Sequence, residues 1–357
     1  MTKKQKTILR YAGGKSRAIK KITPFVESYD EIVSPFLGGG SLEVHWASMG
    51  KKVIAGDVFD ILVKFWNVLL TQPEHLADEL SKIVPTDKEY RIIKEHLMKT
   101  PEVQEMMKDW KIWSDPENPK KTNFYERKPV PLSNLKLAAY YYFNHNTSYG
   151  PGFLGWASKI YMDQSKWNKT IEKVRDFKCP NLKVLNQSFE KTIGDNPGKF
   201  LYLDPPYYIK KEPDNKMLGG IYPMKNIPVH HDKFDHELLR DLLHKHGGDF
   251  VLSYNNCETI REYYSDYEFY FPKWHYSMDI GETRVGENRK ERVSSEDLDK
   301  VDMLTSEIVS LESNCGDEVN TEVKKRIADL KSKRHEIMKK ESHEILIVKR
   351  SNHDNKK

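Results

Sequence analysis

The sequence predicts an α/β protein built on a Rossmann-like sheet of seven strands, and three observations lead to this prediction. Short apolar runs alternate with amphipathic helical patterns over much of the chain. The run Glu31–Val33 leads into a glycine loop, and Val53–Ala55 leads into a carboxylate at Asp57. Phe200–Leu203 has the length of a fully buried parallel strand and ends at Asp204. Open parallel sheets bind ligands at the carboxyl ends of their strands, so we expect a site there.

Seven segments are expected to form the sheet because each is a short run dominated by apolar, β-branched or aromatic residues. In chain order they are Glu31–Val33, Val53–Ala55, Leu182–Leu185, Phe200–Leu203, Phe250–Ser253, Tyr267–Phe271 and Glu344–Val348. The last of them lies close to the end of the chain, so the final strand is expected to belong to the core.

Two segments interrupt the alternation and are expected to be insertions. Residues 72–168 are predicted to form a mostly helical, aromatic-rich domain, and residues 290–341 a helical hairpin. The remaining segments, 1–71, 169–289 and 342–357, are predicted to form the main domain. The second hairpin helix is rich in Lys and Arg, which favours a solvated face, with contact to phosphates as the alternative.

Composition limits the class of protein. The 58 Lys and Arg residues exceed the 53 Asp and Glu residues, giving a net charge of +5, which permits a polyanionic partner. The three cysteines, Cys179, Cys257 and Cys315, lack metal-ligand spacing and indicate a reduced, cytoplasmic setting. The basic N-terminus has no apolar segment of a signal peptide, and no run is long enough to span a membrane. No metal site is expected from the scattered histidines.

Two glycine-containing loops predict a nucleotide-binding crevice. Arg10–Arg17 forms a Gly-Gly turn that leads into a helical pattern, and the spacing around Lys15 is not that of a phosphate-binding Walker motif. Ser34–Ser41 joins the first strand to a helix, and its glycines let the backbone approach a ligand closely. Asp57 then ends the second strand, where a carboxylate can bind a ribose hydroxyl.

The stretch Asp204-Pro205-Pro206-Tyr207 carries the predicted chemistry. The prolines stiffen the turn and leave nearby carbonyl oxygens without local donors. The Asp204 carboxylate and the Pro205 carbonyl can then accept the two N–H groups of an adenine N6 amine, while Tyr207 stacks on the base. The alternative is that these residues form only a rigid turn at the end of a strand.

Together, Tyr-Ala-Gly-Gly-Lys, Pro-Phe-x-Gly-x-Gly-Ser, the strand-ending Asp57 and Asp-Pro-Pro-Tyr resemble the Dam-type (D12 class) DNA adenine-N6 methyltransferases, in that family's order. The resemblance implies a class I methyltransferase sheet and S-adenosylmethionine as methyl donor. It implies catalytic roles for Asp204, Pro205, Pro206 and Tyr207. It implies cofactor binding by Tyr11, Ala12, Gly13, Lys15, Pro35, Phe36, Gly38, Gly40, Ser41, Asp57 and Asp204. One departure is Ser34, where family members usually carry an acid.

In this family the target-recognition region lies between the second strand and Asp-Pro-Pro-Tyr, which here is the 72–168 segment. Asn144, Asn146, Tyr149, Arg127 and Lys128 are its candidate DNA contacts, because asparagines read base edges and aromatic side chains press against bases. The alternative for the tyrosines before this point is a place in the core. The recognition sequence is not assigned.

The expected function is site-specific methylation of N6 of a flipped-out adenine in double-stranded DNA. The enzyme would belong to a restriction-modification, phage or orphan methylation system, with a cognate restriction endonuclease as a possible partner. The alternatives are a cytosine-N4 or RNA adenine methyltransferase, or a non-catalytic DNA-binding protein that retains the fold.

Overall fold

The computed structural model describes residues 5–11, 13–108, 128–149, 152–208, 234–272, 295–313, 321–337 and 344–350. Contacts within the chain divide it into two compact units. The first consists of 1–213, 222–272 and 343–357, and the second of 214–221 and 273–342. Within the described residues, no helix is long and apolar enough to cross a membrane.

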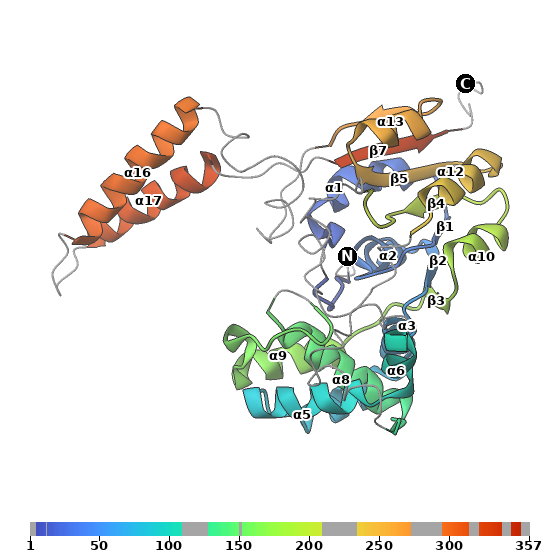
Figure 1. Cartoon of the computed structure of the whole chain (residues 1–357), viewed down its shortest axis with the longest axis horizontal. Coiled ribbons are helices and arrows are strands. Elements are labelled where there is room, and N and C mark those ends of the chain that lie inside the picture. Colours follow the sequence, from blue (N-terminus) through green and yellow to red (C-terminus); the bar gives the residue numbers. More distant parts are fainter. Residues whose placement is uncertain are drawn as a thin grey trace, which may run out of the picture. The chain divides into compact units, whose positions relative to one another are not determined.

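The first unit is built on a seven-stranded sheet with the order β3-β2-β1-β4-β5-β7-β6 (Figure 1). Its strands are β1 (Glu31–Ser34), β2 (Lys52–Asp57), β3 (Leu182–Asn186), β4 (Leu201–Leu203), β5 (Phe250–Asn255), β6 (Glu268–Tyr270) and β7 (Glu344–Lys349). The first five pair in parallel, and β7 runs antiparallel to both β5 and β6. The predicted Rossmann-like sheet of seven strands is confirmed.

The direction of β7 decides which of its residues reaches the functional edge of the sheet. The carboxyl ends of β1, β2, β4 and β5 share one edge, because these strands are parallel. Since β7 is antiparallel, its first residue lies at that same edge, and Glu344 is the register partner of Asn255 at the end of β5. The edge therefore carries Asp57, Asp204, Asn255 and Glu344.

Burial on both faces explains the apolar composition of the central strands. Val33, Leu201, Phe250 and Ile347 are fully excluded from solvent and belong to one continuous core cluster. Neighbouring strands bring them together, as in the register pairs Val33 with Leu201 and Leu201 with Phe250. The rigid core fixes the ends of the strands on which the polar residues lie.

Helices connect the strands of the first unit, and several begin at a side chain that caps the first turn. Ser133, Asp163 and Asp235 each accept a hydrogen bond from a backbone N–H three residues later. The helices are η1 (Lys15–Arg17), α1 (Ile19–Ile22), η2 (Thr23–Val26), α2 (Ser41–Ser48), α3 (Asp60–Thr71), α4 (Pro73–Ser81), α5 (Asp87–Met98), α6 (Pro101–Lys108), α8 (Asn134–Thr147), η4 (Lys159–Tyr161), α9 (Gln164–Arg175), α10 (Phe189–Gly194), α12 (His236–Lys245) and α13 (Glu258–Tyr263).

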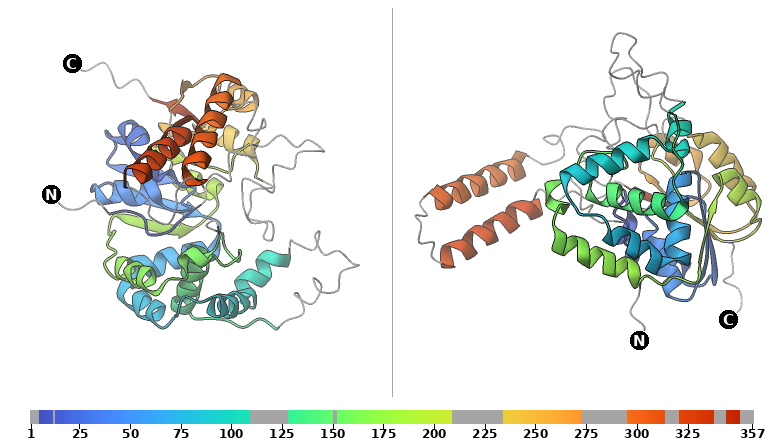
Figure 2. Two further views of the ribbon diagram at one scale, coloured as in Figure 1. Left: turned by 90° about the vertical axis from the view of Figure 1, so that its left-hand side faces the viewer. Right: turned by 90° about the horizontal axis from the view of Figure 1, so that it is seen from below.

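Helices α4, α5, α6 and α8 and the start of α9 lie in the segment predicted to be a helical insertion, where α4 and α5 pack against α8 and α9 packs against α4 (Figure 2). Tyr141 and Tyr142 of α8 are buried, which confirms the alternative that places these tyrosines in the core. The indole N–H of Trp167 in α9 donates to the carbonyl of Ile83 at 3.1 Å, joining α9 to the end of α4. α8 also packs against α3, so this part belongs to the same compact unit as the sheet.

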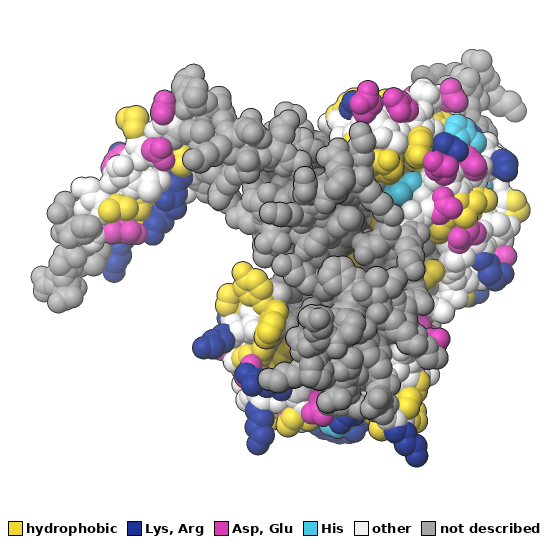
Figure 3. Space-filling view, in the orientation of Figure 1, with side chains coloured by type: hydrophobic (Ala, Val, Ile, Leu, Met, Phe, Trp, Pro, Cys, Tyr) yellow, Lys and Arg dark blue, Asp and Glu magenta, His cyan; other side chains and the backbone are white. Residues whose placement is uncertain are grey.

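The second unit contains two helices, α16 (Ser295–Ser313) and α17 (Thr321–Ile337), which lie side by side (Figure 2). They occupy the segment in which the sequence predicts a helical hairpin. Arg326 binds Glu307 at 2.9 Å and Lys331 binds Glu312 at 2.7 Å, so basic side chains of α17 pair with acidic ones of α16. Side chains of both charges are visible on this unit in Figure 3. The pairing agrees with a solvated face.

A close approach of two loops at the amino-terminal edge of the sheet generates a stability prediction. A Cβ atom added to Gly248 would lie 2.6 Å from backbone atoms of Gly198 and Lys199, whereas one added to Gly247 would meet nothing within 4 Å. We expect Gly248→Ala to lower the free energy of unfolding by about 2 kcal/mol through overpacking. Gly247→Ala is the control and should change it by less than about 0.5 kcal/mol. Urea unfolding of both variants measures this, and equal midpoints would contradict it.

Candidate active site

The centre of the site is an ion pair between Lys15 and Asp204. Asp204 follows β4 directly, and Lys15 begins η1 after the Gly13-Gly14 turn. The ammonium of Lys15 lies 2.8 Å from Oδ1 of Asp204, and the Lys15 side chain is only 4% exposed. The loop containing Lys15 and the acidic corner after β4, predicted as parts of one site, therefore meet.

Glu344 is the third charged residue of this cluster. Its Oε1 atom lies 3.4 Å from Nζ of Lys15, and it also accepts a hydrogen bond from the hydroxyl of Tyr207. Lys15 in turn donates to the Tyr207 hydroxyl at 3.4 Å. The Tyr207 hydroxyl therefore lies between a cation and a carboxylate.

Burial and charge act in opposite directions on the pKa values of these groups. Burial tends to lower the pKa of Lys15, but Asp204 and Glu344 outweigh it and the pKa is raised. Burial raises the pKa of Asp204, against the opposing effect of Lys15. Burial also raises the pKa of Glu344 to about 7, with Lys15 again opposing it. One lysine thus stays protonated between two acids that are harder to ionise than usual.

Glu43 is the fourth ionisable residue of the site, after Lys15, Asp204 and Glu344, and it lies beside Ser34. The Ser34 hydroxyl donates to Oε1 of Glu43 at 2.7 Å, and both residues are buried. Burial raises the pKa of Glu43 to about 7, and Asp204 adds to the effect. Ser34 is the position at which the resemblance leads one to expect an acid, and here α2 supplies a carboxyl group to that place instead.

The glycine loop after β1 lies against the N-terminal loop. A Cβ atom at Gly38 would lie 3.0 Å from the Tyr11 ring, and one at Gly39 would lie 2.4 Å from Cβ of Tyr11. The hydroxyls of Ser16 and Ser41 are 3.0 Å apart and join the two loops again. Gly38 has φ +47°, a left-handed conformation that favours glycine. The two loops therefore pack against each other, as expected for parts of one site.

The turn from the glycine loop into α2 is fixed by Gly40. Its φ of +61° is left-handed, and a Cβ atom there would lie 2.7 Å from the ring of Trp66. The Trp66 indole N–H also donates to the Gly38 carbonyl at 3.1 Å. Both contacts hold the loop at the amino-terminal end of α2.

Asp57 binds the glycine loop from the neighbouring strand. Its two carboxylate oxygens accept from the backbone N–H groups of Gly38 at 3.0 Å and Phe59 at 2.9 Å. These two bonds fix the carboxylate next to the glycine loop. Asp57 therefore lies beside the glycine loop, and its role in binding a ribose remains a prediction.

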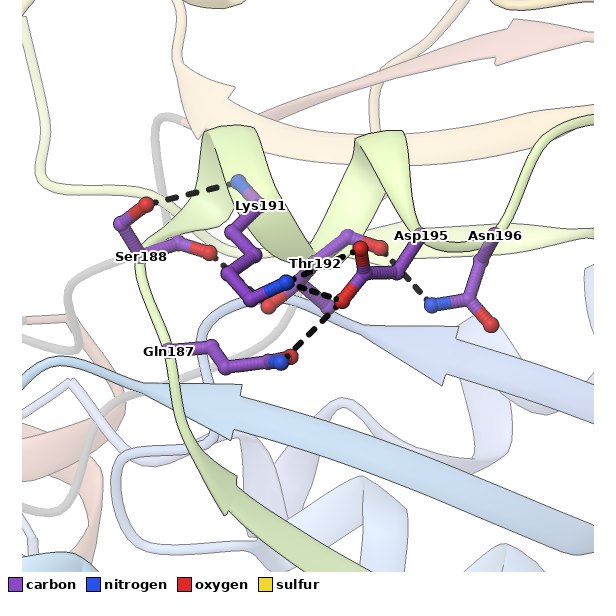
Figure 4. Close-up of polar contacts among 6 residues, drawn as sticks. All are labelled: Gln187, Ser188, Lys191, Thr192, Asp195 and Asn196. Carbon is purple, nitrogen blue, oxygen red and sulfur yellow. Dashed lines mark hydrogen bonds and ion pairs between the residues drawn. The ribbon is translucent and has the colours of Figure 1, made fainter.

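Helix α10 supports Asp57 from the other side. The backbone N–H of Gln187 donates to the Asp57 carbonyl at 3.2 Å, and the Gln187 side chain donates to Asp195 at 3.1 Å. Figure 4 shows this side chain and Lys191 converging on Asp195. A Cβ atom at Gly56 would lie 2.5 Å from the Thr192 hydroxyl, so α10 approaches β2 closely next to Asp57.

Phe36 and Pro35 occupy the start of the glycine loop. Pro35 is buried, and the Phe36 ring stacks on Phe189 with centroids 5.7 Å apart. Phe234 contacts both rings, at 5.6 Å from Phe36 and 5.1 Å from Phe189. This aromatic cluster contains Phe189, the first residue of α10, and α10 is the helix that approaches β2 next to Asp57.

The turn after Asp204 is held by the end of β5. Asn255 accepts from the backbone N–H of Tyr208 and donates to its carbonyl, both at 2.9 Å. Pro205 is buried, while Pro206 and Tyr207 are partly exposed. The reciprocal bonds fix the backbone that carries Tyr207, and the Asn255 amide thus holds this turn.

The candidate DNA contacts differ in their exposure. Asn144 is fully buried and its Oδ1 accepts from the Leu154 backbone at 2.7 Å, and Asn146, 6% exposed, accepts from Arg10 at 3.0 Å. This differs from the expected contact with base edges, because both side chains bind the protein's own backbone. Tyr149 is 63% exposed and Lys128 is exposed, as a DNA contact requires. Arg127 and the predicted cofactor residue Ala12 lie outside the described residues.

Helix α8 connects this region to the crevice through Tyr11. The His145 ring stacks on Tyr11 with centroids 5.6 Å apart, and its Nε2 donates to the Arg10 carbonyl at 2.7 Å. Burial lowers the pKa of His145 to about 4, so the ring is neutral at pH 7. The N-terminal loop is therefore held from behind by a buried, uncharged side chain.

Three residues of interest were missed by sequence reasoning. Glu344 was assigned only to a strand, Glu43 only to a helical pattern, and Trp156 was not singled out. Trp156 is 78% exposed and its carbonyl accepts from the Tyr149 backbone at 2.6 Å, so two exposed aromatic residues are neighbours. Two features of the sequence could have indicated Glu344 and Trp156. Glu344 is a charged residue at the start of an apolar strand, and Trp156 is a tryptophan in a glycine-rich loop.

The described residues contain no group of three or more His, Cys, Asp or Glu side chains that could hold a metal ion. His236, one of the histidines weighed for such a site, instead binds the Tyr254 hydroxyl.

The strand order, the glycine loop with Asp57 and the strand-ending Asp-Pro-Pro-Tyr agree with an α/β Rossmann-like methyltransferase fold. Residues 11–278 match the family model of the D12 class N6 adenine-specific DNA methyltransferases, and the chain belongs to this family.

Two curated proteins are similar to part of the chain. Both are called DNA adenine methylase and come from Vibrio cholerae serotype O1, one from a Classical Ogawa strain and one from an El Tor Inaba strain. Each is 30% identical over 80 residues. The matched stretch spans 22% of this chain and 28% of the length of each relative.

The raised pKa of Glu43 gives a prediction about stability. Between pH 4.5 and about 7 the unfolded chain ionises Glu43 while the folded protein keeps the proton, so stability is lost as pH rises. Relative to the wild type, Glu43→Gln should therefore gain about 3 kcal/mol of unfolding free energy across this window. Urea unfolding at pH 4.5 and pH 8 measures the difference.

The exposed Glu262 in α13 provides the control, and Glu262→Gln should follow the wild type at both pH values. A constant difference between Glu43→Gln and the wild type would contradict the raised pKa.

Proposed function

We propose that this protein transfers a methyl group from S-adenosylmethionine to N6 of an adenine flipped out of double-stranded DNA. The observation that carries the proposal is the 2.8 Å contact between Lys15 and Asp204. It joins the glycine crevice, where a nucleoside donor fits, to the acidic corner, where an exocyclic amine fits. Transfer between two bound groups requires this proximity.

The crevice residues fit the proposed donor, which supplies an electrophilic methyl group on a sulfonium. Tyr11 and Phe36 offer aromatic surface, and Asp57 places a carboxylate, the group that accepts from ribose hydroxyls, beside the glycine loop. The carboxyl groups of Glu43 and Glu344, which are buried, and of Asp204, which is 22% exposed, favour a cation in their neighbourhood. Among the described residues of the site, these three acids face one ammonium, that of Lys15, and this excess supports a positively charged ligand.

At the acidic corner, Asp204 and the Pro205 carbonyl are proposed to accept the two N–H groups of the target amine. Accepting both hydrogens draws the nitrogen lone pair out of the purine ring and aims it at the methyl group. Methyl transfer places positive charge on the nitrogen, so a carboxylate at that position stabilises the transition state. Asp204 can then hold the proton that the methylated nitrogen releases.

Target recognition is proposed for residues 72–168, with Tyr149, Trp156 and Lys128 as the contacts. Both aromatic side chains are exposed on one short loop, which directly follows α8. Figure 3 shows hydrophobic side chains gathered on this helical part of the first unit. Aromatic rings of this kind stack on bases that have left the helix. A role within a restriction-modification, phage or orphan system in the cytoplasm is part of the same proposal.

Asp204→Asn tests the chemistry. It keeps the shape of the side chain but removes its charge, and we expect kcat to fall by about 100-fold or more. Purified protein, genomic DNA and labelled S-adenosylmethionine measure the rate, and Asp266→Asn at an exposed position in the same unit should match the wild type. Mass spectrometry of the digested nucleosides identifies the methylated base.

Label at cytosine N4 or only in RNA would contradict adenine in DNA as the substrate. Duplex binding without any transfer by the folded wild type would favour a non-catalytic DNA-binding protein.

The exposed aromatic pair generates a second test. Trp156→Ala and Tyr149→Ala should each raise the Kd for DNA about 5-fold or more, because stacking on a base contributes about 1–3 kcal/mol. Both residues are more than half exposed, so folding should be preserved. Val84→Ala, at another exposed apolar position of the helical part, is the control. Fluorescence anisotropy with labelled duplex measures the affinities, and unchanged values for both aromatic variants would exclude this loop.

A further inference from the structure

Glu344 is a buried ionisable residue to which the proposed transfer step assigns no role. Its side chain is 2% exposed, at the first residue of a strand whose other residues are almost all apolar. Its Oε1 atom binds Tyr207 and lies near Lys15, and its Oε2 atom is buried without a hydrogen-bond partner among the described residues. Burial of a carboxyl group with one unbonded oxygen lowers the stability of the fold, and a functional role would explain why Glu344 occupies this position.

The position of Glu344 follows from strand direction. Because β7 is antiparallel, Glu344 lies opposite Asn255 at the edge that carries the site. Asn255 holds the backbone of Tyr208 through two hydrogen bonds, and Glu344 holds the side chain of Tyr207. Two adjacent strands thus fix Tyr207, the last residue of Asp-Pro-Pro-Tyr, through its side chain, and Tyr208, the residue after it, through its backbone.

We propose that Glu344 is a positioning residue for methyl transfer, which holds the Tyr207 ring and the Lys15 ammonium in the geometry that receives the target base. This inference rests on the proposed function. Glu344 itself contacts neither the reacting amine nor the methyl group. It acts through two residues that face them.

The contacts explain how one carboxylate can orient the ring. The Tyr207 hydroxyl donates to Glu344 and accepts from Lys15 at 3.4 Å, so it is held from two sides. A ring tethered at its far end loses the freedom to rotate about its side-chain bonds. It then offers a fixed face for stacking, as orientation-dependent catalysis requires.

The same carboxylate also shares Lys15 with Asp204. Lys15 lies 2.8 Å from Asp204 and 3.4 Å from Glu344, so its charge is divided between two acids. Without Glu344, the lysine would have Asp204 as its one close carboxylate partner among the described residues. A tighter ion pair between Lys15 and Asp204 would leave Asp204 less able to accept hydrogen bonds from the target amine. Loss of Glu344 would thus lower kcat in two ways, by freeing the Tyr207 ring and by tightening this ion pair.

A second tyrosine–carboxylate pair in the same sheet provides a matched control. The Tyr29 hydroxyl donates to Asp249 at 2.7 Å, and Asp249 is 6% exposed. Asp249 directly precedes β5, so this pair lies at the opposite edge of the sheet from Glu344. It has the same chemistry and similar burial, but no access to the proposed site.

The test is a double-mutant cycle with Glu344→Gln and Tyr207→Phe, measured as kcat for methyl transfer to genomic DNA. We expect Glu344→Gln to lower kcat at least 5-fold. The double variant should be less than about 3-fold slower than the slower single variant, because both changes break one interaction. Asp249→Asn and Tyr29→Phe should each leave kcat within 2-fold of the wild type.

Glu344→Asp keeps the charge but withdraws it by one methylene, and it takes the place of Glu344→Gln if that variant does not fold. It should show the same loss, since the contact with Tyr207 is broken. A kcat within 5-fold of the wild type, or losses that multiply as for independent residues, would overturn the inference.

The two proposals fail in different ways. If the wild type transfers no methyl group to DNA, the proposed function fails and this inference with it. If the wild type is active and the Glu344 variants match it, only the role of Glu344 is rejected.

Discussion

The ion pair between Lys15 and Asp204 links two parts of the chain that are almost 190 residues apart, and the arrangement of the site depends on it. Burial of a lysine is unfavourable unless carboxylates compensate for the lost hydration. Asp204 and Glu344 supply this compensation, which keeps Lys15 charged. The N-terminal loop is therefore held at the carboxyl edge of the sheet, and with it the Tyr11 ring that packs on the glycine loop.

Sheet topology determines which residues can join this cluster. Parallel strands deliver only their last residues to the carboxyl edge, as with Asp57, Asp204 and Asn255. An antiparallel strand in the same sheet delivers its first residue instead, and β7 brings Glu344. The reversal thus combines residues from the start, the middle and the end of the chain at one place, although two long segments separate them in sequence.

The features predicted correctly from the sequence are those that a short, contiguous stretch of residues reveals. Each strand is an apolar run, and the glycine loop and Asp-Pro-Pro-Tyr are contiguous, so both were found without knowledge of the fold. Glu344 and Glu43 have no such signal, because only the packing of distant elements buries them. Asn144 was expected at a DNA surface because of its polarity. Yet α8 is enclosed on nearly every side, and the amide serves the protein's own backbone.

Ser34 stands where an acid is expected from the resemblance. The site nevertheless has a carboxyl group at this place, so the structure preserves the charge of the site and not the acid at position 34. The hydroxyl of Ser34 binds the carboxyl group of Glu43, which reaches the same place from α2. Together with Asp204 and Glu344, this gives the described part of the site three acids and one lysine, and removal from water raises the pKa of each acid. Such an excess is unfavourable for the protein alone, because each ionisation must occur away from water. A cationic ligand offsets that cost, so the raised pKa values and an affinity for positive charge follow from the same burial.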